Sequence, residues 1–122
     1  MVEVICDTNF LIHLANKRIK NFDKISIDFG DLTFLVPNVV HYELIQLKNN
    51  PRKTIEIEKT LEYIKKFKSI PINGTYADKA ILEYVKLKKS FVGTMDKELK
   101  KFTKNFGGTI ISFQNDSLVL ES

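Results

Sequence analysis

Residues 2–14 read VEVICDTNFLIHL, and this stretch decides the fold class. It opens with a short apolar run that ends at Cys6, which is typical of a buried β-strand. Asp7, Thr8 and Asn9 follow, and side chains of this kind commonly cap a helix, so the apolar positions after them predict a helix. A strand that passes directly into a helix indicates the first unit of an α/β fold.

The rest of the chain repeats this alternation. Further strands are predicted at residues 33–36, 69–72, 90–94 and 109–113, and helices at residues 18–29, from 38 to before 49, 54–67, from 75 onward, and 96–106. Such alternation favours a mostly parallel sheet with helices on both faces, an α/β/α sandwich. Because no linker or repeat interrupts the pattern, residues 1–122 are expected to form one domain.

Composition favours a cytoplasmic protein that meets a polyanion. The net charge is +4, and setting aside four candidate site carboxylates leaves 19 basic against 11 acidic side chains, an excess of eight. A basic body around an acidic centre suits nucleic acid. No apolar run approaches the roughly 20 residues that span a bilayer, so no membrane partner is expected. The single Cys6 lies in an apolar strand and is interpreted as a core residue.

Four acidic residues are expected to meet at one edge of the sheet. Asp7 directly follows the first strand, Asp96 follows another strand by two residues, and Glu43 and Asp78 lie early in helices entered from the same edge. Clustered carboxylates repel one another unless a cation compensates them. Without His or Cys at zinc-ligand spacing, the carboxylates favour Mg²⁺ or Mn²⁺.

Each acid also has an ordinary structural alternative. Asp7 or Asp96 could cap the helix that follows it, although Thr8 or Asn9 could replace Asp7 in that role. Asp78 lies three residues after a threonine, as in a capping box. Glu43 lies on an apolar helix face and could pair with a lysine at the edge of the core. The joint pattern of the four acids supports a site more strongly than any single acid does.

The motifs around these acids resemble those of PIN-domain nucleases. They are CDTNFLI at residues 6–12, PNVVHYEL at 37–44, GTYAD at 74–78 and VGTMDKELK at 92–100, in the family's order. The resemblance covers essentially the whole chain. Two positions depart from the pattern: Lys79 stands where a further acid often follows, and Met95 stands where Asn is common. Neither departure removes one of the four acids, but loss of the Asn amide could loosen the orientation of Asp96.

The resemblance implies a metal-dependent endoribonuclease. Asp7, Glu43, Asp78 and Asp96 would then bind one or two Mg²⁺ or Mn²⁺ ions, with Thr94 and Asn9 in supporting roles. The GTYAD segment resembles the branch that processes small-subunit ribosomal RNA precursors, which implies a pre-ribosomal particle as partner. The alternatives are a VapC-type toxin with an antitoxin partner and a catalytically silent RNA-binding scaffold. A homodimer is a family-level expectation.

Lysines in the last predicted helix offer an RNA-binding face beside Asp96. Lys97, Lys101 and Lys104 share one side of that helix and could hold backbone phosphates, although an ordinary solvated face is the alternative.

Two other classes of α/β protein fit the sequence poorly. A phosphorelay receiver domain needs an early pair of acids and a phosphorylatable Asp after a central strand, and the sequence has no Asp between Asp31 and Asp78. A dinucleotide-binding enzyme is disfavoured because no G-x-G-x-x-G follows a strand.

Overall fold

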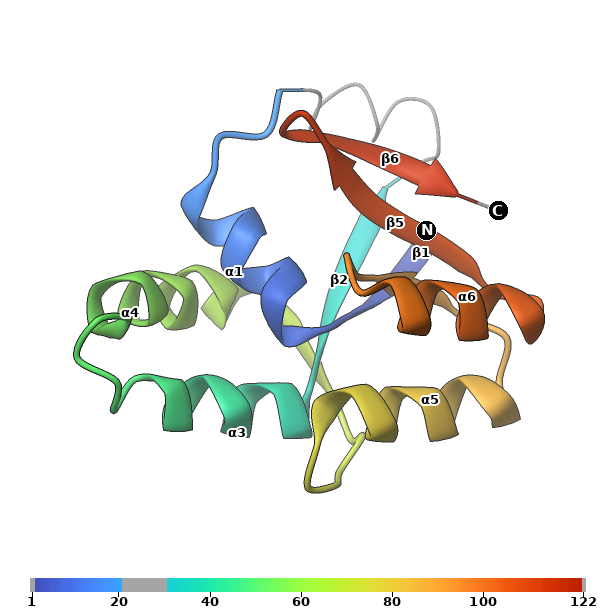
Figure 1. The fold of residues 1–122 in the computed structure, drawn as a ribbon, viewed down its shortest axis with the longest axis horizontal. Helices are drawn as coiled ribbons and strands as arrows, with labels where there is room; N and C mark the ends of the chain where they lie inside the picture. Colours follow the sequence, from blue (N-terminus) through green and yellow to red (C-terminus); the bar gives the residue numbers. More distant parts are fainter. Residues whose placement is uncertain (1, 21–30, 122) are drawn as a thin grey trace.

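The computed structural model describes residues 2–20 and 31–121, in which strands and helices alternate (Figure 1). The strands are β1 (Val2–Cys6), β2 (Leu32–Pro37), β3 (Lys68–Ile70), β4 (Phe91–Gly93), β5 (Thr109–Gln114) and β6 (Ser117–Glu121). The helices are α1 (Thr8–Asn16), α3 (Asn38–Leu47), α4 (Thr54–Tyr63), α5 (Ala77–Leu87) and α6 (Lys97–Asn105), and a 3₁₀ turn (Ile64–Lys66) follows α4. None of the described helices has the length and apolar character needed to cross a membrane.

One sheet of six strands, in the order β3-β2-β1-β4-β5-β6, organises the described residues. All neighbouring strands are parallel except β5 and β6, which form an antiparallel hairpin. The prediction of an α/β fold with a mostly parallel sheet is therefore confirmed. The strand order places β1 in the interior of the sheet, where the carboxyl ends of β1, β2 and β4 lie at the same edge.

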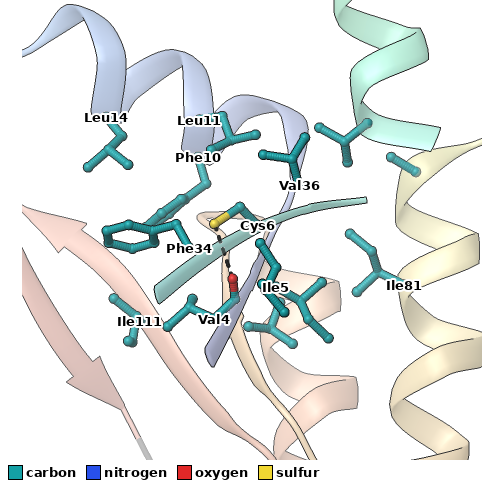
Figure 2. Close-up of a cluster of buried hydrophobic side chains, with 14 of the residues drawn as sticks. Val4, Ile5, Cys6, Phe10, Leu11, Leu14, Phe34, Val36, Ile81 and Ile111 are labelled. Atoms are coloured by element: carbon teal, nitrogen blue, oxygen red, sulfur yellow. Dashed lines mark hydrogen bonds between the residues drawn. The ribbon is translucent and has the colours of Figure 1, made fainter. Parts of the chain in front are cut away.

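Helices cover both faces of the sheet, as the core close-up shows. Phe10 and Leu14 of α1 pack over one face beside Phe34, while Ile81 of α5 lies on the side of Ile5 (Figure 2). The ring of Phe10 stacks on that of Phe113 at a centroid distance of 4.9 Å. Burial of such large apolar side chains supplies the main driving force for folding.

The Phe10 ring also explains a glycine at the end of β4. A Cβ atom at Gly93 would lie 2.8 Å from this ring, closer than real Cβ contacts occur. Gly93 therefore allows α1 to approach the strand whose end carries the last acidic motif. This close approach brings the beginning of the chain against residues more than 80 positions later.

The structure differs from the sequence-based expectation at residues 18–20 and contains an additional strand, β6. Residues 18–20, the start of the helix predicted at 18–29, are not helical, and the remainder of that prediction lies outside the described residues. Strand β6 was not predicted. Asn115 and Asp116, with φ values of 52° and 60°, form the two-residue turn that leads into it. Positive φ at both turn residues matches the type I′ geometry that suits a hairpin.

The carboxylate of Glu121 joins the end of β6 to α6 and β5. It accepts hydrogen bonds from the Ser112 hydroxyl at 2.5 Å, from Lys100 Nζ at 3.1 Å and from Lys104 Nζ at 3.3 Å. The Ser112 hydrogen bond and the two lysines lower the pKa of Glu121 to about 2. The last strand is thus fixed to the helix by an ionised carboxylate.

We predict that Glu121→Gln removes part of the acid sensitivity of the fold. Because the pKa of Glu121 is lower in the folded chain than its ordinary value of 4.5, its stabilisation is present above pH 4.5 and is lost as the pH falls towards about 2. After discounting for partial exposure, the variant should lose about 1–2 kcal/mol at pH 7 and very little at pH 2. Urea unfolding across this range measures the difference. Glu62→Gln, which disrupts only an exposed ion pair with Lys65, is the matched control, and an equal effect there would contradict the prediction.

Candidate active site

The four predicted acids line one pocket beyond the carboxyl ends of β1 and β4. This pocket, the acid pocket below, has a volume of about 200 Å³ and is lined by Asp7, Thr8, Asn9, Glu43, Ala77, Asp78 and Asp96. These residues come from the starts of α1, α5 and α6 and from the middle of α3. Figure 1 shows why α3 and α5 contribute together, because the N-terminal ends of these two helices meet.

Asp7 is the most buried of the four acids, with an exposed fraction of 9%. It is the N-cap of α1: its Oδ1 accepts a hydrogen bond from the Phe10 amide at 2.9 Å, and its Oδ2 accepts one from the Thr94 hydroxyl. The expectation that Thr8 or Asn9 caps this helix and leaves Asp7 free is therefore wrong. The capping role leaves further lone pairs on both carboxylate oxygens.

Burial raises the pKa of Asp7 to about 6. The hydrogen bonds from Thr94 and Phe10 oppose this shift, while the negative charges of Asp96 and Glu43 add to it. The ionised form of Asp7 is therefore less stable in the folded chain than in water. A group held in this state gains from any cation that enters the acid pocket.

Thr94 connects the first acid to the last one. Its side chain is fully buried, and its hydroxyl donates to Asp7 Oδ2 while accepting from the Asp96 amide at 3.0 Å. Asp96 is the N-cap of α6, where its Oδ1 accepts from the amides of Glu98 and Leu99. Asp96 Oδ2 accepts no hydrogen bond within the described part of the chain, so this oxygen remains available to a ligand.

Glu43 connects three helices rather than pairing with a lysine. Its Oε1 accepts from the Thr8 hydroxyl at 2.7 Å, and its Oε2 accepts from the Ala77 amide at 2.8 Å. The second bond satisfies one of the free amides at the N-terminus of α5, where negative charge is favoured. Thr8 is a residue of the site that the sequence analysis considered only as a helix cap. Its place directly after Asp7, in the first acidic motif, was the available signal.

Asp78 lies in the first turn of α5 and is exposed. The capping box expected between Thr75 and Asp78 does not form, because the helix begins at Ala77 with Tyr76 as N-cap and no side-chain cap bond. Asp78 Oδ1 instead accepts from the Lys79 amide at 2.9 Å. In α3, the residue at the N-cap position is Pro37, and no side chain caps this helix.

The donors of the acid pocket suit a hard divalent cation. Carboxylate oxygens are the ligands that Mg²⁺ and Mn²⁺ prefer, and Oδ2 of both Asp78 and Asp96 is unused among residues 2–20 and 31–121. Across those residues, no three His, Cys, Asp or Glu side chains lie close enough to surround one ion. Mg²⁺ characteristically keeps several waters and binds through one or two carboxylates, so this donor set fits it.

The three lysines of the predicted RNA-binding face differ in their ion pairing. Lys97 and Lys101 are exposed and make no ion pair in the part of α6 and its surroundings that the structure describes. Lys104 pairs with Glu121 at 3.3 Å, so part of its charge is already neutralised. Lys97 directly follows Asp96, which places the first of these positive charges beside the acid pocket.

Comparisons with known proteins find matches over most of the sequence. The model of a family described as "PIN like domain" matches residues 4–115. Ribonuclease VapC4 of Methanocaldococcus jannaschii is 34% identical over 110 residues, which cover 83% of this chain and 82% of that protein.

Two solved structures have similar folds. The PIN domain endonuclease Utp24 superposes with a TM-score of 0.80 and 28% identity, covering 98% of this chain and 90% of that one. A domain of a functionally unknown protein from Methanocaldococcus jannaschii has a TM-score of 0.59 and 18% identity, covering 93% and 92% of the respective chains, and shows the fold alone.

Proposed function

Because this chain belongs to the PIN-like domain family, we propose that it is a metal-dependent endoribonuclease that hydrolyses RNA phosphodiester bonds. One observation carries this proposal: Asp7, Glu43, Asp78 and Asp96, from four separate motifs, line a single pocket. Capping alone does not account for the group, because Glu43 and Asp78 are not the N-caps of their own helices. The ribonuclease and endonuclease relatives support the same reaction class.

We propose distinct roles for the four acids. Asp7, Asp78 and Asp96 would hold Mg²⁺ or Mn²⁺, directly or through water, and Thr94 would orient Asp7. The bound ion would supply a nucleophilic water and neutralise charge on the phosphate. Glu43 has both oxygens engaged by Thr8 and Ala77, so we assign it to fixing the pocket wall and orienting water. Asn9 lines the pocket and is exposed, which suits a contact to substrate or to bound water.

The proposal predicts that RNA cleavage requires both the ion and Asp96. Native protein should cleave a structured RNA in Mg²⁺ or Mn²⁺ buffer and stop when EDTA is added. Asp96→Asn keeps the cap oxygen but weakens the ion's ligand, so the rate should fall by about 100-fold. Glu98→Gln, two residues further along α6, is the matched control and should cleave like the native protein. Equal cleavage by native protein and Asp96→Asn would point to a contaminating nuclease and refute the site.

For the biological role, we propose ribosomal RNA processing, with a pre-ribosomal particle as partner. The GTYAD segment at residues 74–78, which resembles the branch that processes small-subunit ribosomal RNA precursors, supports this assignment. The fold of the PIN domain endonuclease Utp24 matches nearly the whole chain. The ribonuclease VapC4 match favours a second candidate, a toxin that a small antitoxin neutralises. Purification from native cells separates the two roles: ribosomal precursor particles should accompany a processing enzyme, and a short partner protein should accompany a toxin.

A further inference from the structure

A groove next to the acid pocket carries the two exposed tyrosines of the described chain. This groove, the tyrosine groove below, has a volume of about 730 Å³ and is lined by Tyr42, Glu43, Gln46, Leu47, Gly74, Thr75 and Tyr76. It runs between the outer side of α3 and the loop that enters α5. Its volume lies within the range typical of ligand sites.

The tyrosine groove lies next to the acid pocket. Glu43 lines both, and Tyr76 directly precedes Ala77, whose amide holds Glu43 Oε2 at 2.8 Å in the wall of the acid pocket. An extended polymer with one phosphate in the acid pocket can therefore reach the groove with a neighbouring unit.

The exposure of these two tyrosines is unusual for this chain. Tyr42 and Tyr76 are 57% and 58% exposed, whereas Tyr63 and Tyr84 are partly buried and pack against the core. Single exposed aromatics are common on protein surfaces, but two that line one groove beside a candidate active site are not scattered. More than half of each tyrosine is exposed, although Lys79 Nζ lies over the Tyr76 ring.

The surroundings of Tyr76 suit a nucleotide. Lys79 Nζ lies 5.3 Å from the centre of the Tyr76 ring, which places a positive charge at the edge of the groove, where a backbone phosphate would pass. Base stacking on an aromatic ring tolerates every base, but it requires a base that is free of its partner strand. Neither tyrosine could stack on a base that remains inside a duplex.

We infer that Tyr42 and Tyr76 form a base-stacking subsite that receives an unpaired nucleotide next to the scissile phosphate. The inference rests on the proposed ribonuclease function and deepens it, because it names the side chains that hold a nucleotide beside the scissile phosphate. Lys79 contacts the backbone on the far side of Tyr76. In this role, the position that departs from the acidic pattern of the family contributes to binding the strand.

The test measures RNA binding in a variant whose cleavage is strongly slowed. In the full chain with Asp96→Asn, a short oligoadenylate carrying a fluorescent adenine analogue is titrated in Mg²⁺ buffer. Tyr42→Ala and Tyr76→Ala should each weaken binding about tenfold and reduce the quenching of the analogue. Tyr42→Phe and Tyr76→Phe keep the ring and should bind as the parent does. Leu87→Ala, an exposed apolar change at the other end of α5, is the control, and thermal unfolding shows that each variant is folded.

The outcomes separate this inference from the proposed function. Unchanged binding by both alanine variants, or no binding of unpaired RNA by the parent, overturns the stacking subsite even if native protein cleaves RNA. Loss of a dimer in sedimentation with unchanged RNA affinity also overturns it and assigns the groove to a second copy of the chain. Tyrosine-dependent binding without any metal-dependent cleavage by the native protein supports the subsite and refutes the ribonuclease proposal.

Discussion

Asp7→Asn should reduce RNA cleavage by about 100- to 1,000-fold while making the protein more stable in EDTA. The loss of activity follows from removing the most buried anionic ligand of the acid pocket. The gain in stability follows from the pKa of about 6, which means that the ionised carboxylate is disfavoured in the folded chain. This penalty is present above pH 6 and disappears as the pH falls towards the ordinary value of 3.8.

The asparagine keeps an oxygen that can accept from the Phe10 amide, so the cap of α1 is retained. It loses the charged acceptor for the Thr94 hydroxyl, which offsets part of the gain. We expect a net stabilisation of about 1–2 kcal/mol at pH 8, or a thermal midpoint a few degrees higher. Addition of Mn²⁺ should then stabilise the native protein and leave the variant unchanged.

Calorimetry at pH 8, with and without Mn²⁺, measures this stability change beside the cleavage assay. Asp31→Asn, a change at an exposed acid that does not line the acid pocket, is the control and should alter neither quantity. A variant that loses activity and stability together would show that Asp7 acts mainly as a helix cap. Such a result would contradict the role that we propose for it.

Thr94→Val should lower stability by about 2–4 kcal/mol and cleavage by about 10- to 100-fold. Valine has nearly the same shape, so the fully buried position stays filled. The change leaves Asp7 Oδ2 without its donor and the Asp96 amide without its acceptor. An uncompensated buried polar group such as Asp7 Oδ2 costs more than its hydrogen bond contributes, and the partly buried Asp96 amide adds to this cost.

Thr94→Ser keeps the hydroxyl and should restore most of the activity, which separates the hydrogen bond from the packing of the methyl group. Urea unfolding and kcat/KM give the two readouts. Combining Thr94→Val with Asp7→Asn should cost less stability than Thr94→Val alone, because the unpaired charge is gone. Equal stability of Thr94→Val and the native protein would mean that the hydroxyl has no role in holding the two acids.

Much of the fold was predictable because the apolar pattern reflects burial directly. The helix predicted from residue 38 is observed as Asn38–Leu47, since Val40 and Leu44 fall on one side of a helical turn and both are fully buried. The gathering of the acids followed from topology, because parallel strands end at one edge. What could not be read from the chain was β6. Its turn, Asn115-Asp116, lacks the glycine that most clearly signals such hairpins.

The sequence predicts where the four acids lie better than it predicts their hydrogen-bond partners. The sequence leaves capping and metal binding as alternatives for Asp7 and Asp96, but the structure gives both residues capping bonds and also places both in the acid pocket. The bonds of Glu43 to Thr8 and Ala77 join residues 35 and 34 positions apart, and no local pattern encodes such contacts. Hydrogen bonds between distant motifs depend on how the helices dock, which periodicity does not specify.

The interior position of β1 has a consequence for the newly made chain. Synthesis delivers β1 first, but β1 is paired on one side with β4, and Thr94 and Asp96 lie just beyond that strand. Until residues 91–96 have left the ribosome, Asp7 lacks the hydroxyl that holds it, and the last acid is missing. Under the proposed function, the growing polypeptide is therefore expected to gain activity only after these residues have emerged.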